Sequence, residues 1–293
     1  MTIQLAEHYG LCFGVRDALA EAERLAQRGP LTILGELVHN PVVRERLVRA
    51  GVTEGALDRP AETPQVMITA HGASDTQRAA WRLSGRGLAD GTCPLVRHAH
   101  EQLRLLVQTG YAPVVIGQRG HVEVNGLIGD FPGAVVISGE TDIPSLPSAP
   151  RLGVISQTTQ PIDRVQSLVS AIRTARPAAE VRFVDTVCQP TKNRQLAVRK
   201  LLAECDTMVV VGGRNSNNTL QLVAAAEVAG LATFHIERAA DLDPAWFLHA
   251  ERVGLTAGTS TLKETVAEVH NRLLEIAAVI GAPEGAREPL VAQ

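Results

Sequence analysis

No stretch of this sequence is long and apolar enough to cross a membrane, since its uncharged apolar runs fall short of the about 20 residues that a spanning helix needs. The first ten residues, MTIQLAEHYG, lack the basic segment and apolar stretch of a targeting signal. The net charge is −3 and no run of lysine or arginine is present, so nothing supplies a broad positive field. We therefore expect a cytoplasmic protein that binds neither membranes nor nucleic acid.

Cysteine is also scarce, with four residues in a chain of 293. No two of them form a Cys-x-x-Cys pair, which argues against a zinc ribbon or a thioredoxin-like site. In a cytoplasmic chain, cysteines are more often reduced thiols or metal ligands than disulfides. With 45% hydrophobic and 20% charged residues, the chain has enough apolar surface to fold without disulfides.

Short β-branched or apolar runs alternate along the chain with amphipathic segments. This alternation is typical of α/β units with buried parallel strands and right-handed crossovers. The expected strands cover residues 31–35, 66–72, 112–117, 181–185, 208–213 and 254–258. The expected helices cover residues 14–28, 94–109, 161–175, 191–204, 218–229 and 261–279.

One local arrangement occurs three times: an extended run, a cysteine and then a helix. It contains Cys12 in GLCFGV, Cys93 in DGTCPLV and Cys188 in DTVCQPT, at intervals of 81 and 95 residues. Each interval is about the size of a small α/β domain. Because ligand sites in open α/β sheets lie beyond the carboxyl ends of the strands, three such domains around a common axis would bring the three thiols together.

We therefore predict three similar small α/β domains with mainly parallel sheets. The first would cover residues 13–93, the second 94–188 and the third 189–282, with residues 1–12 joining the third. Residues 283–293, within PEGAREPLVAQ, are expected to form a flexible tail.

The three cysteines are candidate metal ligands. Taken singly, each would be a packing residue, because free cysteine is among the most buried residue types. Their shared position at helix starts favours a metal site, since a helix N-terminus stabilises the thiolate that binds metals. Cys205, in LLAECDTMVVV, lies late in an expected helix and is expected to pack in the core.

Polar side chains follow the remaining strands. A lone histidine in such a place is usually structural, but His39, His71 and His121 together suggest donors that face one cleft. Imidazole N–H groups and helix-start amides suit a phosphate group. Hydroxyl and amide side chains, which are also the preferred helix N-caps, form a further set: Thr158, Thr159, Ser216, Asn217, Asn218, Thr219 and Ser260.

Glu123 is the only carboxylate within a candidate ligand loop, GQRGHVEVNG. A single glutamate is most often a surface residue. Beside His121 and near a reduced metal centre, it could instead deliver a proton to a leaving hydroxyl group.

These residues together resemble the LytB/IspH family of 4-hydroxy-3-methylbut-2-enyl diphosphate reductases. The resemblance extends through about residue 280 and consists of an ordered series of motifs: CFGV, HN, HG, GTCP, GHxEVxG, SQTT, C-x5-R-Q, NSNNT and AGTS. Such an ordered series is far more specific than any one of its members.

The resemblance implies a cloverleaf-like arrangement of the three domains around a central [4Fe-4S] cluster. Cys12, Cys93 and Cys188 would each ligate one iron, which leaves one iron not ligated by protein. The implied reaction is reductive removal of a hydroxyl group from an allylic diphosphate, giving isopentenyl and dimethylallyl diphosphate at the end of the methylerythritol phosphate route to isoprenoids. An external donor, a ferredoxin or a flavodoxin, would supply the two electrons.

The same resemblance implies the roles of the other polar residues. Glu123 would be the proton donor. The substrate, chiefly its diphosphate, would be held by His39, His71, His121, Thr158, Ser216, Asn217, Asn218 and Ser260. Three positions depart from the commoner family pattern, namely Val122 and Leu262, each in place of a frequent proline, and Asn217 in place of a frequent serine.

Three alternatives compete with this function. A dehydratase of the quinolinate synthase type would also use one cysteine per domain, but it would need groups that bind carboxylates, often arginine. A non-catalytic electron-transfer protein would normally have four cysteine ligands and no polar cleft. A nucleotide-binding protein without metal is disfavoured because VVVGGRNSNN matches neither GxGxxG nor a P-loop.

Overall fold

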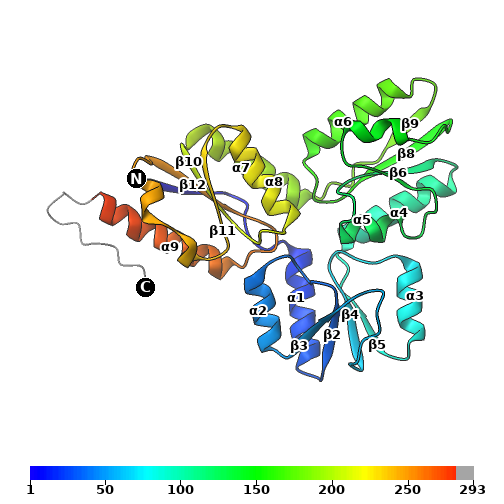
Figure 1. The fold of residues 1–293 in the computed structure, drawn as a ribbon, viewed down its shortest axis with the longest axis horizontal. Helices are drawn as coiled ribbons and strands as arrows, with labels where there is room; N and C mark the ends of the chain where they lie inside the picture. Colours follow the sequence, from blue (N-terminus) through cyan, green and yellow to red (C-terminus); the bar gives the residue numbers. More distant parts are fainter. Residues whose placement is uncertain (282–293) are drawn as a thin grey trace. The chain divides into compact units, whose positions relative to one another are not determined.

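The computed structural model describes residues 1–281, so the predicted tail at residues 283–293 lies outside the described residues. The described chain forms three four-stranded sheets in which all neighbouring strands are parallel, and helices connect the strands (Figure 1). The predicted α/β fold with parallel sheets is confirmed. No helix within residues 1–281 has the length and apolar character to cross a membrane.

The first sheet has the strand order β3-β2-β4-β5. Its strands are β2 (Leu31–Leu34), β3 (Val52–Gly55), β4 (Gln65–Ile68) and β5 (Gly87–Asp90). The helices of this part of the chain are α1 (Phe13–Ala26), α2 (Pro41–Arg49) and α3 (Asp75–Leu83).

The second sheet has the order β7-β6-β8-β9. Its strands are β6 (Ala112–Ile116), β7 (Val135–Ile137), β8 (Arg151–Ser156) and β9 (Glu180–Phe183). The helices are α4 (Pro94–Gln108), α5 (Val122–Ile128), the 3₁₀ helix η1 (Glu140–Ser145) and α6 (Ile162–Ala175).

The third sheet has the order β1-β12-β10-β11. Its strands are β1 (Thr2–Leu5), β10 (Thr207–Val211), β11 (Ala232–Ile236) and β12 (Arg252–Ala257). The helices are α7 (Gln189–Glu204), α8 (Asn217–Val228), the 3₁₀ helices η2 (Ala239–Asp241) and η3 (Pro244–Phe247), and α9 (Lys263–Ile280).

The three sheets share one topology. In each, the chain starts at a central strand, crosses to one edge, returns to the other central strand and ends at the opposite edge. In the first two sheets the last edge strand is the next strand of the chain, β5 or β9. In the third sheet that place is taken by β1, where Thr2 pairs with Arg252 and Leu5 with Leu255. The first residues of the chain therefore complete its last sheet.

By their internal contacts these sheets fall into two compact units. One unit consists of residues 13–38 and 46–192 and contains the first and second sheets. The other consists of residues 1–12, residues 39–45 and the described chain from Asn193 onward, and contains the third sheet.

Buried side chains alternate along the strands of the second sheet. Val114 and Ile116 point to a cluster with α6, whereas Val115 points to a cluster with α4 and α5. The third sheet follows the same plan, with α9 on one face and α7 and α8 on the other. Because both faces are covered, the central strands β6, β8, β10 and β12 are mostly apolar, and β10 is buried along its whole length.

Phe247 anchors the core of the third sheet. Its side chain is fully buried, and it packs edge-on against Phe234, on which Trp246 is stacked with ring centroids 4.4 Å apart.

We expect Phe247→Ala to lower the free energy of unfolding by about 3 to 5 kcal/mol, because truncating a buried aromatic residue leaves a cavity. Urea unfolding followed by tryptophan fluorescence measures the loss.

The neighbouring Leu248 is the matched control, since it is 58% exposed. Leu248→Ala should change stability by no more than about 0.5 kcal/mol. Equal losses in the two variants would contradict this description of the core.

Candidate active site

The cysteines at positions 12, 93 and 188 occupy the same place in the three sheets. Each follows the last edge strand, β1, β5 or β9, and comes directly before or at the start of a helix. In each case the cysteine N–H donates a hydrogen bond to a carbonyl in the loop after the neighbouring central strand. The bonds run from Cys12 to Thr259 (3.2 Å), from Cys93 to Ala70 (3.1 Å) and from Cys188 to Thr158 (2.9 Å).

Within the described residues none of these cysteines forms a disulfide, and each is partly exposed. Cys93 is the N-cap residue of α4, and its thiol makes no capping hydrogen bond to the helix. A side chain at Gly14 would place a Cβ 2.4 Å from the Cys93 Sγ, so the glycine makes room for this sulfur. The Cys188 Sγ lies 3.1 Å from the Thr191 hydroxyl. Positions at helix starts stabilise thiolates, which suits metal ligation.

Cys205 has a different environment. It follows the end of α7 directly, rather than lying within the helix, and it is buried in a cluster with Leu201 and Met208. Burial raises the pKa of its thiol, and the nearby carboxylates of Asp206 and Glu204 raise it further. The thiol is therefore kept protonated, and the residue fills the core as expected.

The two central strands of each sheet are followed by the polar loops. His39 follows β2 and His71 follows β4; His121 and Thr158 follow β6 and β8; Ser216 and Ser260 follow β10 and β12. In this topology the chain leaves the two central strands in opposite directions. The loops after those strands form the switch point at which open α/β sheets bind ligands.

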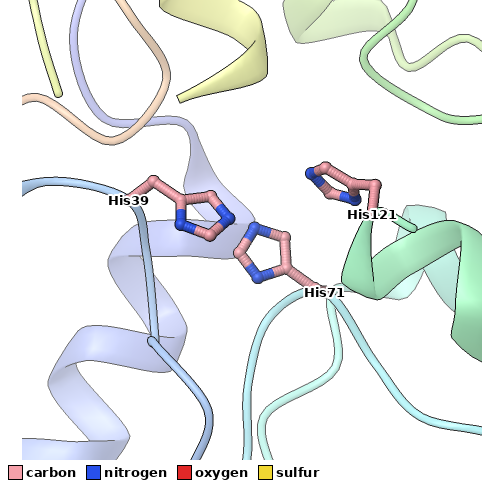
Figure 2. Close-up of side chains that lie close together, drawn as sticks. All are labelled: His39, His71 and His121. Carbon is pink, nitrogen blue, oxygen red and sulfur yellow. The ribbon is translucent and has the colours of Figure 1, made fainter. Parts of the chain in front are cut away.

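His71 and His121 lie close together in the unit that contains the first and second sheets. Their rings meet edge-on, with centroids 5.5 Å apart. Figure 2 shows the two side chains pointing toward one another. The Nδ1 atom of His121 accepts a hydrogen bond from the Glu123 N–H (3.1 Å) and caps α5. The ring is therefore held with Nδ1 as acceptor, which leaves Nε2–H as a donor. His39 belongs to the other unit, where its carbonyl oxygen packs against Gly213.

His100, in contrast, is a core histidine. It is 5% exposed, and neither ring nitrogen has a hydrogen-bond partner among residues 1–281. Burial lowers its pKa and keeps the ring neutral.

Glu123 is buried rather than on the surface, with 2% of the residue exposed. Its Oε1 accepts a hydrogen bond from the Thr158 N–H at 2.7 Å. Burial raises the pKa of Glu123 from 4.5 to about 7, although hydrogen bonds from Thr158 oppose the shift. A carboxyl group with this pKa is protonated for much of the time near neutral pH, so it can act as an acid.

The hydroxyl and amide residues of the third sheet are also buried. The Ser216 Oγ accepts from the Thr219 N–H at the start of α8, and the Asn218 Oδ1 accepts from the Thr259 N–H (3.0 Å). These bonds use acceptors and leave the Ser216 O–H and the Asn218 amide N–H groups able to donate. The Oγ of Ser260 is buried and has no hydrogen-bond partner within the described residues. Such an atom fits a site that binds a polar ligand.

Gln157 was not singled out from the sequence. It is fully buried, and its Oε1 accepts from the Gln118 N–H and from the Gln160 side chain, both at 3.0 Å. It thereby ties the loop after β6 to the loop after β8. A long polar residue directly after a buried strand, in SQTTQ, was the available signal.

The sequence of this chain is similar to those of known proteins over nearly its whole length. A profile described as LytB protein matches residues 3–274. The 4-hydroxy-3-methylbut-2-enyl diphosphate reductase of Aquifex aeolicus is 36% identical over 280 residues, covering 94% of this chain and 96% of the relative. The reductase of the same name from Geotalea daltonii is 37% identical over 282 residues, covering 94% and 98%.

Two solved structures are similar over most of the chain. The E-1-hydroxy-2-methyl-but-2-enyl-4-diphosphate reductase from Plasmodium falciparum has a TM-score of 0.86 at 25% identity, covering 92% of this chain and 86% of that one. A second structure, of (E)-4-hydroxy-3-methyl-but-2-enyl diphosphate reductase, the terminal enzyme of the non-mevalonate pathway, has a TM-score of 0.69 at 34% identity. It is covered in full, by 94% of this chain.

The burial of Glu123 predicts a pH-dependent stability. Because its pKa rises from 4.5 to about 7 on folding, the folded chain keeps a proton that the unfolded chain has lost between these values. Its contribution to stability is thus full below the unfolded pKa and is lost as the pH rises through the folded pKa. A shift of this size corresponds to about 3 kcal/mol.

We expect Glu123→Gln to remove this dependence. Urea unfolding at about pH 5 and about pH 8 should show that the wild type loses about 2 to 3 kcal/mol more than the variant. Glu101→Gln, on an exposed position of α4, is the matched control and should behave as the wild type. A parallel pH dependence in wild type and Glu123→Gln would contradict the raised pKa.

Proposed function

Because the chain belongs to the LytB protein family, we propose that it reduces 4-hydroxy-3-methylbut-2-enyl diphosphate to isopentenyl diphosphate and dimethylallyl diphosphate. The observation that carries this proposal is the family match over residues 3–274. The reaction consumes two electrons and two protons, and the hydroxyl group leaves as water. It is the last step of the methylerythritol phosphate route. The dehydratase and electron-carrier alternatives are not favoured, because the relatives that cover nearly the whole chain are reductases.

We propose that Cys12, Cys93 and Cys188 hold one [4Fe-4S] cluster with one iron not ligated by protein. Their equivalent places, their exposure and the identical hydrogen bonds of their N–H groups support this ligand set. When bound, the cluster would supply electrons one at a time and an open Lewis-acidic position. A ferredoxin or a flavodoxin would deliver the electrons. Four cysteines that form no disulfide within residues 1–281 are consistent with a reducing, cytoplasmic location.

The diphosphate would be held by neutral donors rather than by arginine clamps. The unpartnered Oγ of Ser260 and the donor groups left on Ser216 and Asn218 support this role. Imidazole N–H groups and the start of α8 add further donors that favour an anion. The full proposed set is His39, His71, His121, Thr158, Ser216, Asn217, Asn218 and Ser260.

Glu123 would donate the proton. Its burial raises the pKa to about 7, so a large fraction of the carboxyl groups is protonated near neutral pH, and the hydrogen bond from the Thr158 N–H fixes its orientation. Glu123 therefore holds its proton out of contact with bulk water.

Leu262 is one of the residues that differ from the commoner family pattern, in which proline is frequent at this position. Its φ is −64°, which is also the value that proline would impose, so the exchange leaves the start of α9 unchanged.

The ligand set predicts the iron content of cysteine variants. Cys93→Ser should lose most of its iron after anaerobic reconstitution, because a serine hydroxyl is a far weaker iron ligand than a thiolate. Cys205→Ser should keep the wild-type iron and sulfide content. Chemical iron and sulfide analysis with Mössbauer or EPR spectroscopy measures both. Loss of iron from Cys205→Ser, or a wild type without a cluster, would overturn the ligand assignment.

The role of Glu123 predicts the kinetics of Glu123→Gln. The variant should keep the cluster and bind substrate with a similar KM, while kcat falls about 10²- to 10⁴-fold, because the amide cannot donate the proton. The wild-type kcat should fall as the pH rises through about 7, and the residual activity of the variant should lack this decline. Steady-state assays with a reduced viologen dye measure both, and unchanged turnover would reject Glu123 as the acid.

A further inference from the structure

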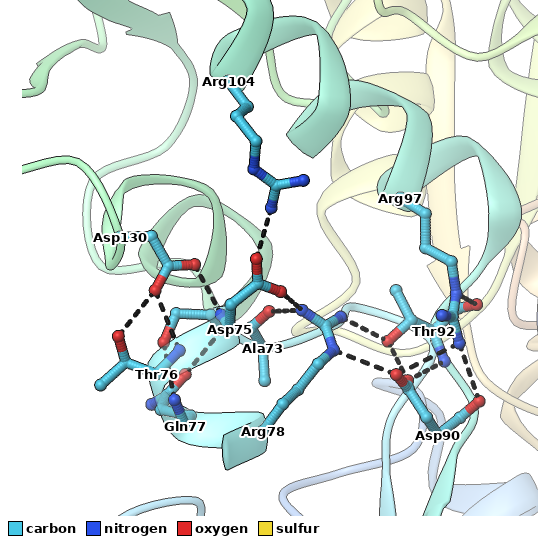
Figure 3. Close-up of polar contacts among 11 residues, drawn as sticks. Ala73, Asp75, Thr76, Gln77, Arg78, Asp90, Thr92, Arg97, Arg104 and Asp130 are labelled. Carbon is cyan, nitrogen blue, oxygen red and sulfur yellow. Dashed lines mark hydrogen bonds and ion pairs between the residues drawn. The ribbon is translucent and has the colours of Figure 1, made fainter. Parts of the chain in front are cut away.

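Arg78, on α3, is a buried arginine whose guanidinium group contacts two separate loops (Figure 3). Its side chain is 9% exposed. Nη1 donates to the Ala73 carbonyl oxygen, Nη2 donates to the Thr92 hydroxyl at 3.0 Å, and Nε donates to the Asp90 carboxylate at 3.0 Å. A planar group with donors in a fixed fork can hold several acceptors at set distances.

The first of these loops follows β4 and contains His71, Gly72 and Ala73. Gly72 has φ +81°, a conformation that favours glycine, and an added Cβ would lie 3.0 Å from the Thr92 methyl group. The His71 loop therefore packs directly on Thr92. The bond from Arg78 to Ala73 fixes the loop one residue farther on.

The second loop begins after Asp90, the last residue of β5, and runs to Cys93. The Asp90 carboxylate accepts from both the N–H and the hydroxyl of Thr92. Arg97 donates to the carbonyl oxygens of Asp90 and Thr92. Cys93 comes next, so the N–H, the hydroxyl and the carbonyl group of Thr92, the residue directly before the thiol, are all held by this network.

The helix that carries Arg78 is itself pinned to α5. The Asp130 carboxylate, after the end of α5, accepts from the N–H groups of Asp75 and Thr76 (2.5 and 3.0 Å). Gly126 within α5 packs against the backbone of Ala73, where an added Cβ would lie 3.4 Å from the Ala73 Cα. Since Glu123 lies in the first turn of α5, the network connects the acid, the His71 loop and the Cys93 loop within one unit.

We propose that Arg78 is a positioning residue, which holds the Cys93 loop and the His71 loop at a fixed separation so that a cluster ligand and a substrate ligand keep one geometry. The inference rests on the proposed function for the roles of Cys93 and His71. The contacts of Arg78 do not depend on it. A simple ion pair would use one acceptor, whereas this guanidinium uses one group from each loop and the carboxylate that orders the second.

The test compares variants that remove the fork with one that does not. Arg78→Lys keeps the charge and loses the planar set of donors. Thr92→Val keeps the shape of Thr92 and loses the hydroxyl that Arg78 binds. Arg104→Lys is the matched control, because Arg104 pairs with Asp75 in the same network but contacts neither loop. Thr92→Ser restores the hydroxyl and serves as the conservative rescue.

The first measurement is the rate at which iodoacetamide alkylates each cysteine of the unloaded full-length chain, followed by mass spectrometry. Arg78→Lys and Thr92→Val should raise the rate at Cys93 about tenfold relative to Cys12 and Cys188, as expected for the loss of charge-assisted hydrogen bonds. Thr92→Ser and Arg104→Lys should keep the wild-type ratio. An equal rise at all three cysteines would show general destabilisation and overturn the proposal.

The second measurement is the release of iron to a chelator from the anaerobically reconstituted protein. Iron release should be about tenfold faster for Arg78→Lys and Thr92→Val than for the wild type and Arg104→Lys. In steady-state assays of the two variants, KM should rise by a larger factor than kcat falls. Wild-type rates in both variants would overturn the positioning role. A wild type that takes up no iron, with selective alkylation at Cys93 intact, would instead reject the proposed function and leave the Arg78 contacts standing.

Discussion

The bond from a cysteine N–H to the carbonyl beyond the neighbouring central strand is the contact on which the candidate site depends. It is made three times, once in each sheet, and it fixes the start of a helix against the loop that carries the polar residues. In the second sheet a single residue binds both the cysteine backbone and the buried carboxylate. Thr158 accepts from the Cys188 N–H through its carbonyl oxygen and donates to the Glu123 carboxylate through its N–H. The thiol and the acid are therefore held by opposite sides of one peptide segment.

The sequence was sufficient for the features that leave a local signal. Long apolar runs predicted β6 and β10, amphipathic periodicity predicted α4 and α6, and the repeated cysteine before a helix predicted equivalent junctions. It missed β8, because RLGVIS begins with a charge and contains a glycine, and it missed short elements such as β5 and α5. Glutamate is a residue type that is usually found on the surface, but Glu123 is buried in the structure. Its burial depends on a partner 35 residues away, Thr158, and such pairings leave no local pattern.

Glycine residues and buried charged residues both allow backbones and functional groups to approach one another closely, but by different means. Gly14 leaves room for the Cys93 sulfur, and Gly213 leaves room for the His39 carbonyl oxygen, because any Cβ would overlap them. Around Thr92, in contrast, closeness comes from directed bonds. Arg78 and Asp90 hold the hydroxyl from two sides. Steric room without such bonds would leave the loops free to move, and bonds without room could not form.

The position of β1 has a consequence for how the protein is made. β1 precedes β12 in the chain by about 250 residues, so Thr2 finds its partner only when Arg252 has been synthesised. The first and second sheets are built from contiguous chain and can form during synthesis. The loop that carries Cys12 has its hydrogen-bonding partner only once Thr259 has been synthesised. The junctions of Cys93 and Cys188 can therefore form before the junction of Cys12, which has to await the synthesis of Thr259.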